Sequence, residues 1–312
     1  MRIGIVGAGA LGSVLGGLLF EAGHELVLVE RDAAEVQIVS EQGLWLEGVS
    51  GERLLSPKIV SPHAPAIEAD LVLVLVKSYD TSAAVSQVRD ILSEDGVVLT
   101  LQNGIGNFET LDEAFPGRVL LGTTTIGAMT LGRGRFRHTG FGQTHLGEPD
   151  GSIRERTRAV AAALEGMNAG PVHVVENAVG SVWSKLIINA AVNAPATLLR
   201  VRNGDLPAGD AGHALIHAIV EECLRVVRKK GITLIVDDPE ARVIEVCQGT
   251  AGNLNSMFQD ILAGRDTEID YINGAIAREA AALGIQAEVN RTLALLIKSL
   301  EATVHKRVAD KT

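Results

Sequence analysis

Residues 1–13 read Met-Arg-Ile-Gly-Ile-Val-Gly-Ala-Gly-Ala-Leu-Gly-Ser, and residues 24–31 read His-Glu-Leu-Val-Leu-Val-Glu-Arg. The apolar residues 3–6 predict a buried strand, and residues 26–29 predict a second strand after an intervening helix. Between them lies the turn Gly7-Ala8-Gly9-Ala10-Leu11-Gly12. A strand, a glycine-rich turn, a helix and a second strand together place a dinucleotide pyrophosphate on a helix N-terminus. We therefore expect these six turn residues to bind a dinucleotide cofactor.

The end of the second strand bears on the choice between NAD and NADP. Glu30 stands where a carboxylate commonly binds the ribose hydroxyls of NAD. Arg31, the next residue, offers a guanidinium that can pair with the 2′-phosphate of NADP. Lys77 follows a later strand and supplies a second cation at the same edge of the sheet. We expect NADP as the cofactor, with NAD left open by Glu30.

Composition excludes several classes of protein. The chain has 312 residues and a formal net charge of −10, which argues against a nucleic-acid surface. The apolar runs are too short to cross a membrane, and the amino terminus reads as a core strand rather than a signal peptide. With Cys223 and Cys247 as its two cysteines, the chain has no disulfide framework, and we expect both to be buried. These features favour a cytoplasmic protein that acts on a small molecule, and they leave a homodimer open.

The spacing of apolar residues changes along the chain. The first part alternates short strands with helices, which predicts a doubly wound parallel sheet, whereas the part after Asn177 has helical spacing. We expect an α/β protein with a Rossmann-type domain over residues 1–175 and a mostly helical domain over residues 176–312. The predicted strands are 3–6, 25–29, 71–76, 97–101, 119–122 and 172–175, with 124–147 as antiparallel additions to the same sheet. The predicted helices are 154–167, 183–199, 213–230, 241–248, 256–262 and 270–283.

A polar stripe runs along the first helix of the second half. Lys185, Asn189 and Asn193 are four residues apart, so they share one face of a helix whose other residues are almost all apolar. Buried amines and amides require hydrogen-bond partners, which a polar ligand or the carboxylates of another segment can provide. Partial desolvation lowers the pKa of a lysine towards neutrality, where it can protonate an oxygen that gains charge during hydride transfer. We expect Lys185 to act as that acid.

Three further segments carry candidate polar groups. Asn103 follows a predicted strand and lies at the carboxyl edge of the sheet, although an Asn-Gly pair is also ordinary turn chemistry. Ser256 can cap a helix whose free N–H groups would suit a carboxylate. Glu268 and Asp270 can serve in the site or can be simple first-turn acids, and spacing does not distinguish them.

Taken together, these segments resemble the ketopantoate reductase (2-dehydropantoate 2-reductase) family over nearly the whole chain. The matching motifs are the glycine turn with Arg31, Val76-Lys77, Gln102-Asn103-Gly104-Ile105-Gly106, Lys185-x3-Asn189-x3-Asn193, Asn203 in Arg-Asn-Gly-Asp-Leu, Ser256 in Ser-Met-Phe-Gln-Asp, and Glu268 in Thr-Glu-Ile-Asp-Tyr-Ile-Asn-Gly. The resemblance implies NADPH-dependent reduction of 2-dehydropantoate (ketopantoate) to pantoate in pantothenate biosynthesis.

The same resemblance assigns residue roles. Lys185 would protonate the C2 oxygen, and Glu268 would bind the hydroxyl end of the substrate and position Lys185. Asn103 would lie between the nicotinamide and the substrate. The substrate's other polar groups would contact Asn189, Asn193 and Asn203, and its carboxylate would contact Ser256. No metal site is implied.

Other functions remain open at this point. The same chemistry could act on another branched 2-keto acid, because the catalytic groups contact only the keto carboxylate. A nucleotide-sensing protein without turnover would make the Lys185 stripe structural. An opine dehydrogenase would need an extended pocket, and a phosphosugar dehydrogenase would need clustered cations near Asn189 or Ser256, where the sequence has none.

Overall fold

The computed structural model describes residues 1–64, 67–303 and 305. The chain forms two compact units. The first comprises Met1–Gln102 and Asn107–Val179, and the second comprises Gly180–Thr312 together with the four residues Asn103–Gly106.

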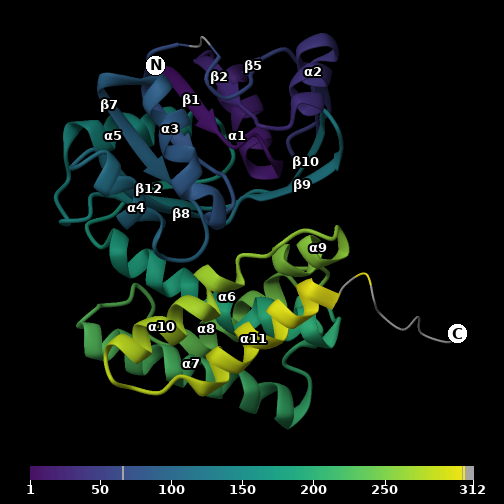
Figure 1. The fold of residues 1–312 in the computed structure, drawn as a ribbon, viewed down its shortest axis with the longest axis vertical. Helices are drawn as coiled ribbons and strands as arrows, with labels where there is room; N and C mark the ends of the chain where they lie inside the picture. Colours follow the sequence, from purple (N-terminus) through teal and green to yellow (C-terminus); the bar gives the residue numbers. More distant parts are fainter. Residues whose placement is uncertain (65–66, 304, 306–312) are drawn as a thin grey trace, which may run out of the picture. The chain divides into compact units, whose positions relative to one another are not determined.

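The first unit is built on an eight-stranded sheet (Figure 1). Its order is β12-β11-β8-β7-β6-β1-β2-β5, and neighbouring strands run parallel except for the antiparallel pair β8 and β11. The strands are β1 (Arg2–Val6), β2 (Glu25–Val29), β5 (Lys58–Val60), β6 (Ala69–Val74), β7 (Leu92–Thr100), β8 (Val119–Thr124), β11 (Thr144–Gly147) and β12 (Val172–Val174). From β5 to β8 this is the strand order of a dinucleotide-binding fold, whose direction reverses between β1 and β6. The predicted α/β class is confirmed.

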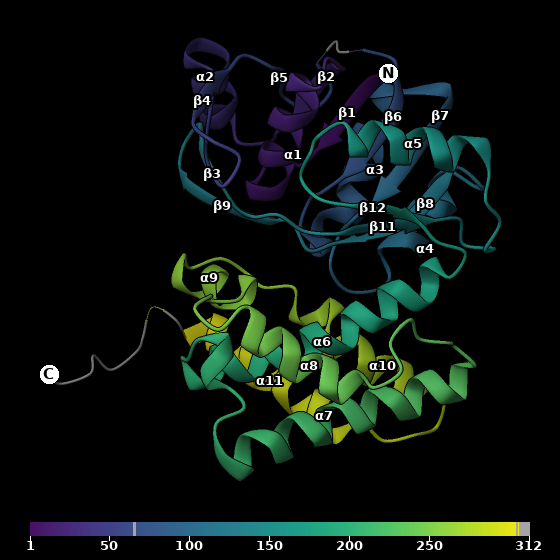
Figure 2. The same cartoon turned by 180° about the vertical axis from the view of Figure 1, so that it is seen from behind.

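The side chains of β1 are apolar on both faces of the sheet, and helices cover both faces. Ile3 and Ile5 pack in one apolar cluster with α1 (Ala10–Glu21) and α5 (Glu155–Glu165). Val6 points to the other face, where α3 (Thr81–Ile91) and α4 (Asn107–Ala114) form a second cluster (Figures 1 and 2). Since side chains of a strand alternate between faces, a run of apolar residues buried on both sides is typical of a central parallel strand.

The segment 124–147 was predicted only in part. Of its strands, β11 does join β8 in the main sheet, but β9 (Gly127–Gly132) and β10 (Arg135–Gly140) form a separate sheet. This four-stranded sheet has the order β4-β3-β10-β9 and includes β3 (Leu44–Gly48) and β4 (Arg53–Leu55), which follow α2 (Ala33–Gln42). Strand β10 runs parallel to β3, and the apolar side chains of Leu44, Leu46 and Phe136 lie in the same cluster as α1. The pairing joins residues about ninety positions apart, for example Trp45 with Arg135, so local pattern could not reveal it.

The second unit is helical. Its helices are α6 (Ala178–Leu199), which begins in the first unit, α7 (Gly209–Lys230), α8 (Pro239–Gly249), α9 (Ser256–Leu262), α10 (Asn273–Ala282) and α11 (Glu288–Thr303). Short 3-10 turns lie at Asn203–Asp205 (η2) and Ile269–Tyr271 (η3), and a further one, η1 (Ser78–Asp80), belongs to the first unit. Helix α6 begins five residues earlier than the predicted 183–199. Helix α11 was not among the predicted helices, although Leu293, Ala294 and Ile297 give it a buried face with helical spacing.

Other expectations concern the surface and the thiols. Within the described residues, no helix is long and apolar enough to cross a membrane.

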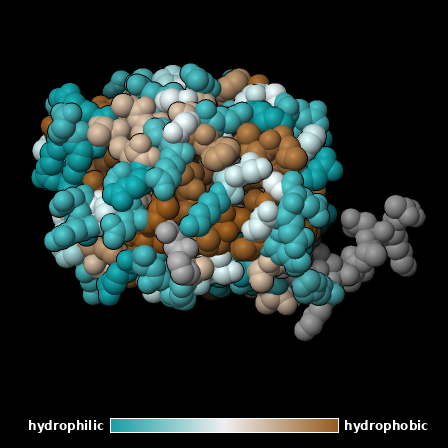
Figure 3. Space-filling view, turned by 90° about the horizontal axis from the view of Figure 1, so that it is seen from above, coloured by the Kyte–Doolittle hydropathy of each residue, from teal (hydrophilic) through white to brown (hydrophobic). Residues whose placement is uncertain are grey.

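Both cysteines are buried, as expected, and burial raises the pKa of Cys223 to about 12 and that of Cys247 to about 11. Seen from above in Figure 3, apolar residues lie in the middle of the visible face and polar residues surround them.

Candidate active site

The glycine turn has the geometry that a pyrophosphate needs. Gly7 has φ +100°, and a Cβ there would come within 2.6 Å of the Val76 nitrogen. A Cβ on Gly12 would lie 2.0 Å from the Gly7 carbonyl oxygen, so α1 can start this close to β1 only with glycine. A Cβ on Gly9 would meet nothing within 4 Å, because this position faces open space at the start of α1. The residues present therefore fit a dinucleotide whose phosphates approach the backbone at Gly9 and at the next two residues.

At the end of β2, four charged groups form two ion pairs. The Arg31 Nη1 donates to Asp80 Oδ1 at 2.8 Å, and the Arg133 Nη1 donates to Asp32 Oδ2 at 2.7 Å. The Glu30 carboxylate accepts the Asp32 backbone N–H at 3.0 Å. Hydrogen bonding to Asp80 raises the pKa of the Arg31 guanidinium, whose side chain is 66% exposed. Arg31 is thus an accessible cation, while the Glu30 carboxylate is engaged by its own turn.

Lys77 stands in a loop that buried amides hold in place. It follows β6 and directly precedes η1. The Gln102 Nε2 donates to the Val76 carbonyl at 2.9 Å and to Thr81 Oγ1 at 2.8 Å, and Asn107 Nδ2 donates to Ser78 Oγ at 3.1 Å. The backbone on both sides of Lys77 is therefore tied to the ends of β7 and α4.

The stripe on α6 holds a lysine in a poorly hydrated position. Lys185 is partly buried on a helix whose neighbouring residues Leu186 and Ile187 are fully buried. Burial lowers the pKa of the Lys185 ammonium to about 8, and the Glu268 carboxylate acts in the opposite direction. At neutral pH the amine is still mostly protonated, yet it gives up its proton more readily than an exposed lysine.

Three predicted residues meet beside this lysine. Asn103 Nδ2 donates to Glu268 Oε2 at 3.1 Å, and Asn189 Nδ2 approaches Asn103 Oδ1 at 3.5 Å. All three belong to the second unit, because the short segment containing Asn103 is part of it. Glu268 is 6% exposed. The structure thus brings together Asn103, Asn189 and Glu268, with Lys185 within the electrostatic reach of Glu268.

The segment around Glu268 also shapes the Asn103 loop. Gly104 has φ +81°, and a Cβ there would lie 2.4 Å from the Tyr271 carbonyl oxygen. That same oxygen accepts the Ile105 N–H at 3.1 Å. Gly104 is therefore required by a close backbone approach as well as by its positive φ. The Asn-Gly pair alone indicates only a turn and does not reveal this close approach.

The remaining predicted residues lie at the other end of the stripe or beyond it. Asn193 is buried on α6. Asn203 Nδ2 donates to Thr250 Oγ1 at 2.9 Å, and its buried Oδ1 has no hydrogen-bond partner among the described residues. Ser256 is exposed and is the first residue of α9. Asn203 is thus engaged with Thr250, and all three residues remain predicted substrate contacts.

The cap of α9 was predicted one residue too late. Asn255, not Ser256, is the N-cap, and its Oδ1 accepts the Phe258 N–H at 3.0 Å. Thr197 Oγ1 also donates to Asn255 Oδ1, at 3.4 Å. Thr197 continues the four-residue spacing of the stripe, which is the signal that could have identified it.

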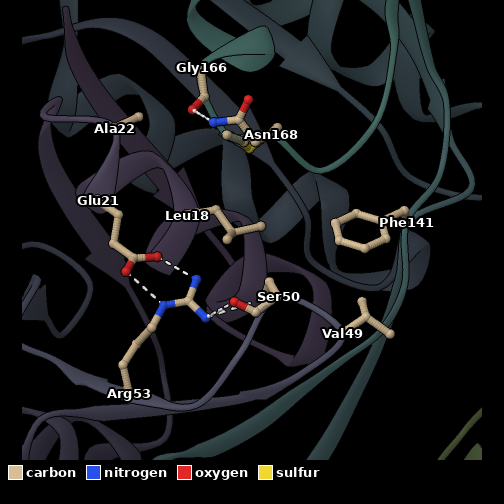
Figure 4. Close-up of a pocket in the computed structure, with 10 residues that line it drawn as sticks. Leu18, Glu21, Ala22, Val49, Ser50, Arg53, Phe141, Gly166 and Asn168 are labelled. Atoms are coloured by element: carbon tan, nitrogen blue, oxygen red, sulfur yellow. Dashed lines mark hydrogen bonds and ion pairs between the residues drawn. The ribbon is translucent and has the colours of Figure 1, made fainter.

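A pocket of about 490 Å³ lies elsewhere in the first unit. It is at the carboxyl end of α1, whereas the glycine turn is at the amino end. Figure 4 shows Arg53 joined to Glu21 and Ser50, with Phe141 and Val49 to the right in that view. None of the predicted site residues lines this pocket. Among the described residues there is also no group of three or more His, Cys, Asp or Glu side chains that could hold a metal ion.

Comparison with known proteins identifies the family. Residues 3–151 match the sequence model of "Ketopantoate reductase PanE/ApbA", and residues 177–301 match that of its C-terminal part. The chain belongs to the ketopantoate reductase family. It is therefore related to oxidoreductases, and the predicted resemblance is confirmed.

Relatives and solved structures agree with this membership. A 2-dehydropantoate 2-reductase of Pyrococcus abyssi is 36% identical, covering 98% of this chain and 100% of the relative, and one of Archaeoglobus fulgidus is 34% identical over 96% and 98%. A PanE/ApbA family ketopantoate reductase from Ralstonia eutropha has a TM-score of 0.90 at 32% identity, covering 98% and 100%. A D-mandelate dehydrogenase solved with NADH and anilino(oxo)acetate has a TM-score of 0.91 at 28% identity, with the same coverage.

Proposed function

We propose that this protein reduces 2-dehydropantoate to pantoate with NADPH, and that Lys185 is the general acid. The observation that carries the proposal is the partly buried Lys185, whose pKa is about 8, within reach of the Glu268 carboxylate. Reduction of a ketone adds a hydride at carbon and a proton at oxygen. The reduced nicotinamide would supply the hydride to C2 of the keto acid.

The second unit supplies the proton and holds the substrate. A protonated Lys185 Nζ donates to the C2 oxygen as negative charge develops there, and the amine is left neutral in a site that disfavours its charge. The Glu268 carboxylate, held by Asn103 at 3.1 Å, orients the ammonium and binds the substrate's hydroxyl. Amides along the stripe, Asn189 and Asn193, bind substrate oxygens without adding charge. Asn203 and Ser256 complete this proposal as contacts for the substrate's remaining polar groups.

The first unit holds the cofactor. The Gly7–Gly12 turn receives the pyrophosphate at the start of α1. Arg31 and Lys77 are proposed to bind the 2′-phosphate, which favours NADPH. The Glu30 carboxylate already accepts the Asp32 N–H, which supports placing it outside the phosphate contact.

Another small 2-keto acid is the second candidate substrate, since a D-mandelate dehydrogenase with NADH is among the structural neighbours. Steady-state kinetics with NADPH and NADH, each against 2-dehydropantoate, benzoylformate and straight-chain 2-keto acids, separate these functions. The proposal requires the highest kcat/KM for 2-dehydropantoate with NADPH. A preference for benzoylformate with NADH would replace the substrate and the cofactor but keep the role of Lys185. Tight cofactor binding without turnover of any acid would reject the enzymatic proposal.

A further inference from the structure

A buried chain of polar side chains crosses the second unit and ends on α6. It begins at Glu222 on α7, whose Oε1 accepts the Val289 N–H at 3.0 Å and whose Oε2 accepts the Asn290 N–H at 2.9 Å. The Asn290 Nδ2 donates to the same Oε2 at 2.9 Å. Both Glu222 and Asn290 are buried, at 6% and 0% exposure. The carboxylate therefore caps α11 and fixes the orientation of the Asn290 amide.

The next member of this chain is Asn273, the first residue of α10. Its Nδ2 donates to Asn290 Oδ1 at 3.0 Å and to the Ala190 carbonyl oxygen at 3.0 Å. Asn273 is fully buried. The Asn290 Nδ2 donates to Glu222 Oε2 and, at 3.4 Å, to the Ile219 carbonyl oxygen, so the Asn290 Oδ1 faces Asn273. These two acceptors set the direction of the whole chain.

Ala190 lies in the part of α6 that precedes its internal proline. It is adjacent to Asn189 in the polar stripe, and Pro195 follows five residues later inside the helix. Proline has no N–H, so the carbonyl of Ala191 loses its partner within the helix, and such a helix bends readily at this turn. A side-chain donor on the preceding carbonyl fixes the helix at that turn.

The segment that carries Asn273 also carries the other site contacts. Glu268 accepts from Asn103, and the Tyr271 carbonyl accepts the Ile105 N–H. Six consecutive residues, 268–273, thus include the carboxylate that acts electrostatically on Lys185, contacts to the Asn103 loop, and a donor to the backbone of α6. Their relative positions depend on one short segment.

We infer that Asn273, supported by Asn290 and Glu222, is a positioning residue that holds α6 in the register required by the Lys185 stripe. This inference rests on the proposed function of Lys185. The alternative is that the polar chain only stabilises the helical unit, since buried hydrogen-bonded networks also rigidify cores.

The test compares Asn273→Ala with two other variants of the full-length protein. Asn290→Ala leaves Asn273 bound to Ala190 but removes its support, and Val226→Ala, at a fully buried position of α7, is a control for lost packing. For each we would measure the melting temperature, cofactor affinity, kcat, KM for the keto acid, and the pH at which kcat begins to fall.

The inference predicts that Asn273→Ala lowers kcat by about 10–100-fold, the range expected when a reacting group is misplaced by about 1 Å. The alkaline limb of its pH profile should move towards the value of an ordinary lysine, with cofactor affinity unchanged. Asn290→Ala should change kcat and the alkaline part of the pH profile in the same directions, but by smaller amounts. Val226→Ala should lower the melting temperature without moving the limb.

Other outcomes reject the inference. If Asn273→Ala is less stable but has the same kcat and the same pH dependence of kcat as Val226→Ala, the polar chain is only structural. If Asn273→Ala does not fold, the test rests on Asn290→Ala, and an unchanged kcat and pH profile in that variant also show that the chain is structural. Failure of both variants to fold shows the same. Lys185→Ala separates this inference from the proposed function. If Lys185→Ala loses kcat and Asn273→Ala has the wild-type kcat, only the positioning role of Asn273 is rejected. If Lys185→Ala retains its kcat, the role of Lys185 as general acid is rejected.

Discussion

Asn103 and Glu268 are 165 positions apart in the sequence, and their side chains share a hydrogen bond of 3.1 Å. Asp270, only two residues after Glu268, has a different environment. Its carboxylate accepts from the Lys298 ammonium at 2.8 Å, and both side chains are about half exposed. The buried acid therefore faces the proposed site, and the neighbouring acid belongs to a surface ion pair.

Glu268→Gln should lower kcat/KM for the keto acid by about 10²-fold, because the neutral amide cannot orient the Lys185 ammonium in the same way. Asp270→Asn should change it by less than about threefold, since exposed ion pairs contribute little. Steady-state kinetics of the two variants measure this contrast. Equal losses would remove the basis for assigning Glu268.

Lys185→Ala should lower kcat by about 10²-fold or more, the usual effect of losing a general acid. Affinity for NADPH, measured by fluorescence titration, should stay within about twofold because the cofactor contacts proposed here lie in the other unit. Lys298→Ala is a matched control that removes an exposed lysine. A large loss of NADPH affinity in Lys185→Ala would contradict the assigned role.

The reaction should depend on pH through Lys185. The pKa of this amine is about 8, lowered by burial, and only its protonated form can donate. Reduction should thus be insensitive to pH below that value and fall by about tenfold per unit above it. A kcat profile recorded from pH 6 to 10 tests this, with Lys185→Arg expected to lack the limb. A wild-type profile that is flat to pH 10 would argue against Lys185 as the acid.

Arg31 and Glu30 should have opposite effects on cofactor choice. Arg31→Ala should raise KM for NADPH by about tenfold and leave that for NADH nearly unchanged, because it removes one charge-assisted contact to the 2′-phosphate. Glu30→Ala should raise the NADPH to NADH ratio only if the carboxylate can reach the ribose. Ratios of kcat/KM for both cofactors decide this. If Arg31→Ala leaves the ratio of kcat/KM for NADPH to that for NADH unchanged, Arg31 does not bind the 2′-phosphate.

Gly104→Ala should damage the site more than Gly106→Ala. Both glycines have positive φ, so each substitution carries a backbone strain of about 1–3 kcal/mol. A Cβ at Gly104 would also meet the Tyr271 carbonyl at 2.4 Å, whereas nothing lies within 4 Å at Gly106. We expect a lower kcat for Gly104→Ala beyond any shared loss in melting temperature. Indistinguishable variants would show that the close approach is unimportant.

The first half of the fold could be predicted because its determinants are local. The Gly7–Gly12 turn and the strand-length apolar runs define β1, β2, β6, β7 and β8, and parallel pairing follows from the intervening helices. The second sheet could not be predicted, because β3 and β10 are short and pair across about ninety residues. The α9 cap illustrates a smaller limit, since Asn255 and Ser256 are both good capping residues and spacing cannot rank them.

The candidate site was predictable to the extent that it lies on one helix face. Lys185, Asn189 and Asn193 follow from four-residue spacing alone. Glu268 rests on resemblance, and its burial and its bond to Asn103 become visible only when distant segments meet. Asn273 lies within the motif quoted for Glu268, but the sequence could not show its role, because its bond is to the Ala190 carbonyl 83 positions away.

Asn103–Gly106 belongs to the second unit although its neighbours on both sides belong to the first. A gene cut between Val179 and Gly180 would therefore yield a carboxyl-terminal fragment without Asn103 and without the Gly104 contact to Tyr271. Chimaeras that exchange the helical half among relatives would inherit a foreign Asn103 loop from the amino-terminal parent. An exchange that preserves these contacts would have to move the helical half together with a four-residue segment encoded far upstream.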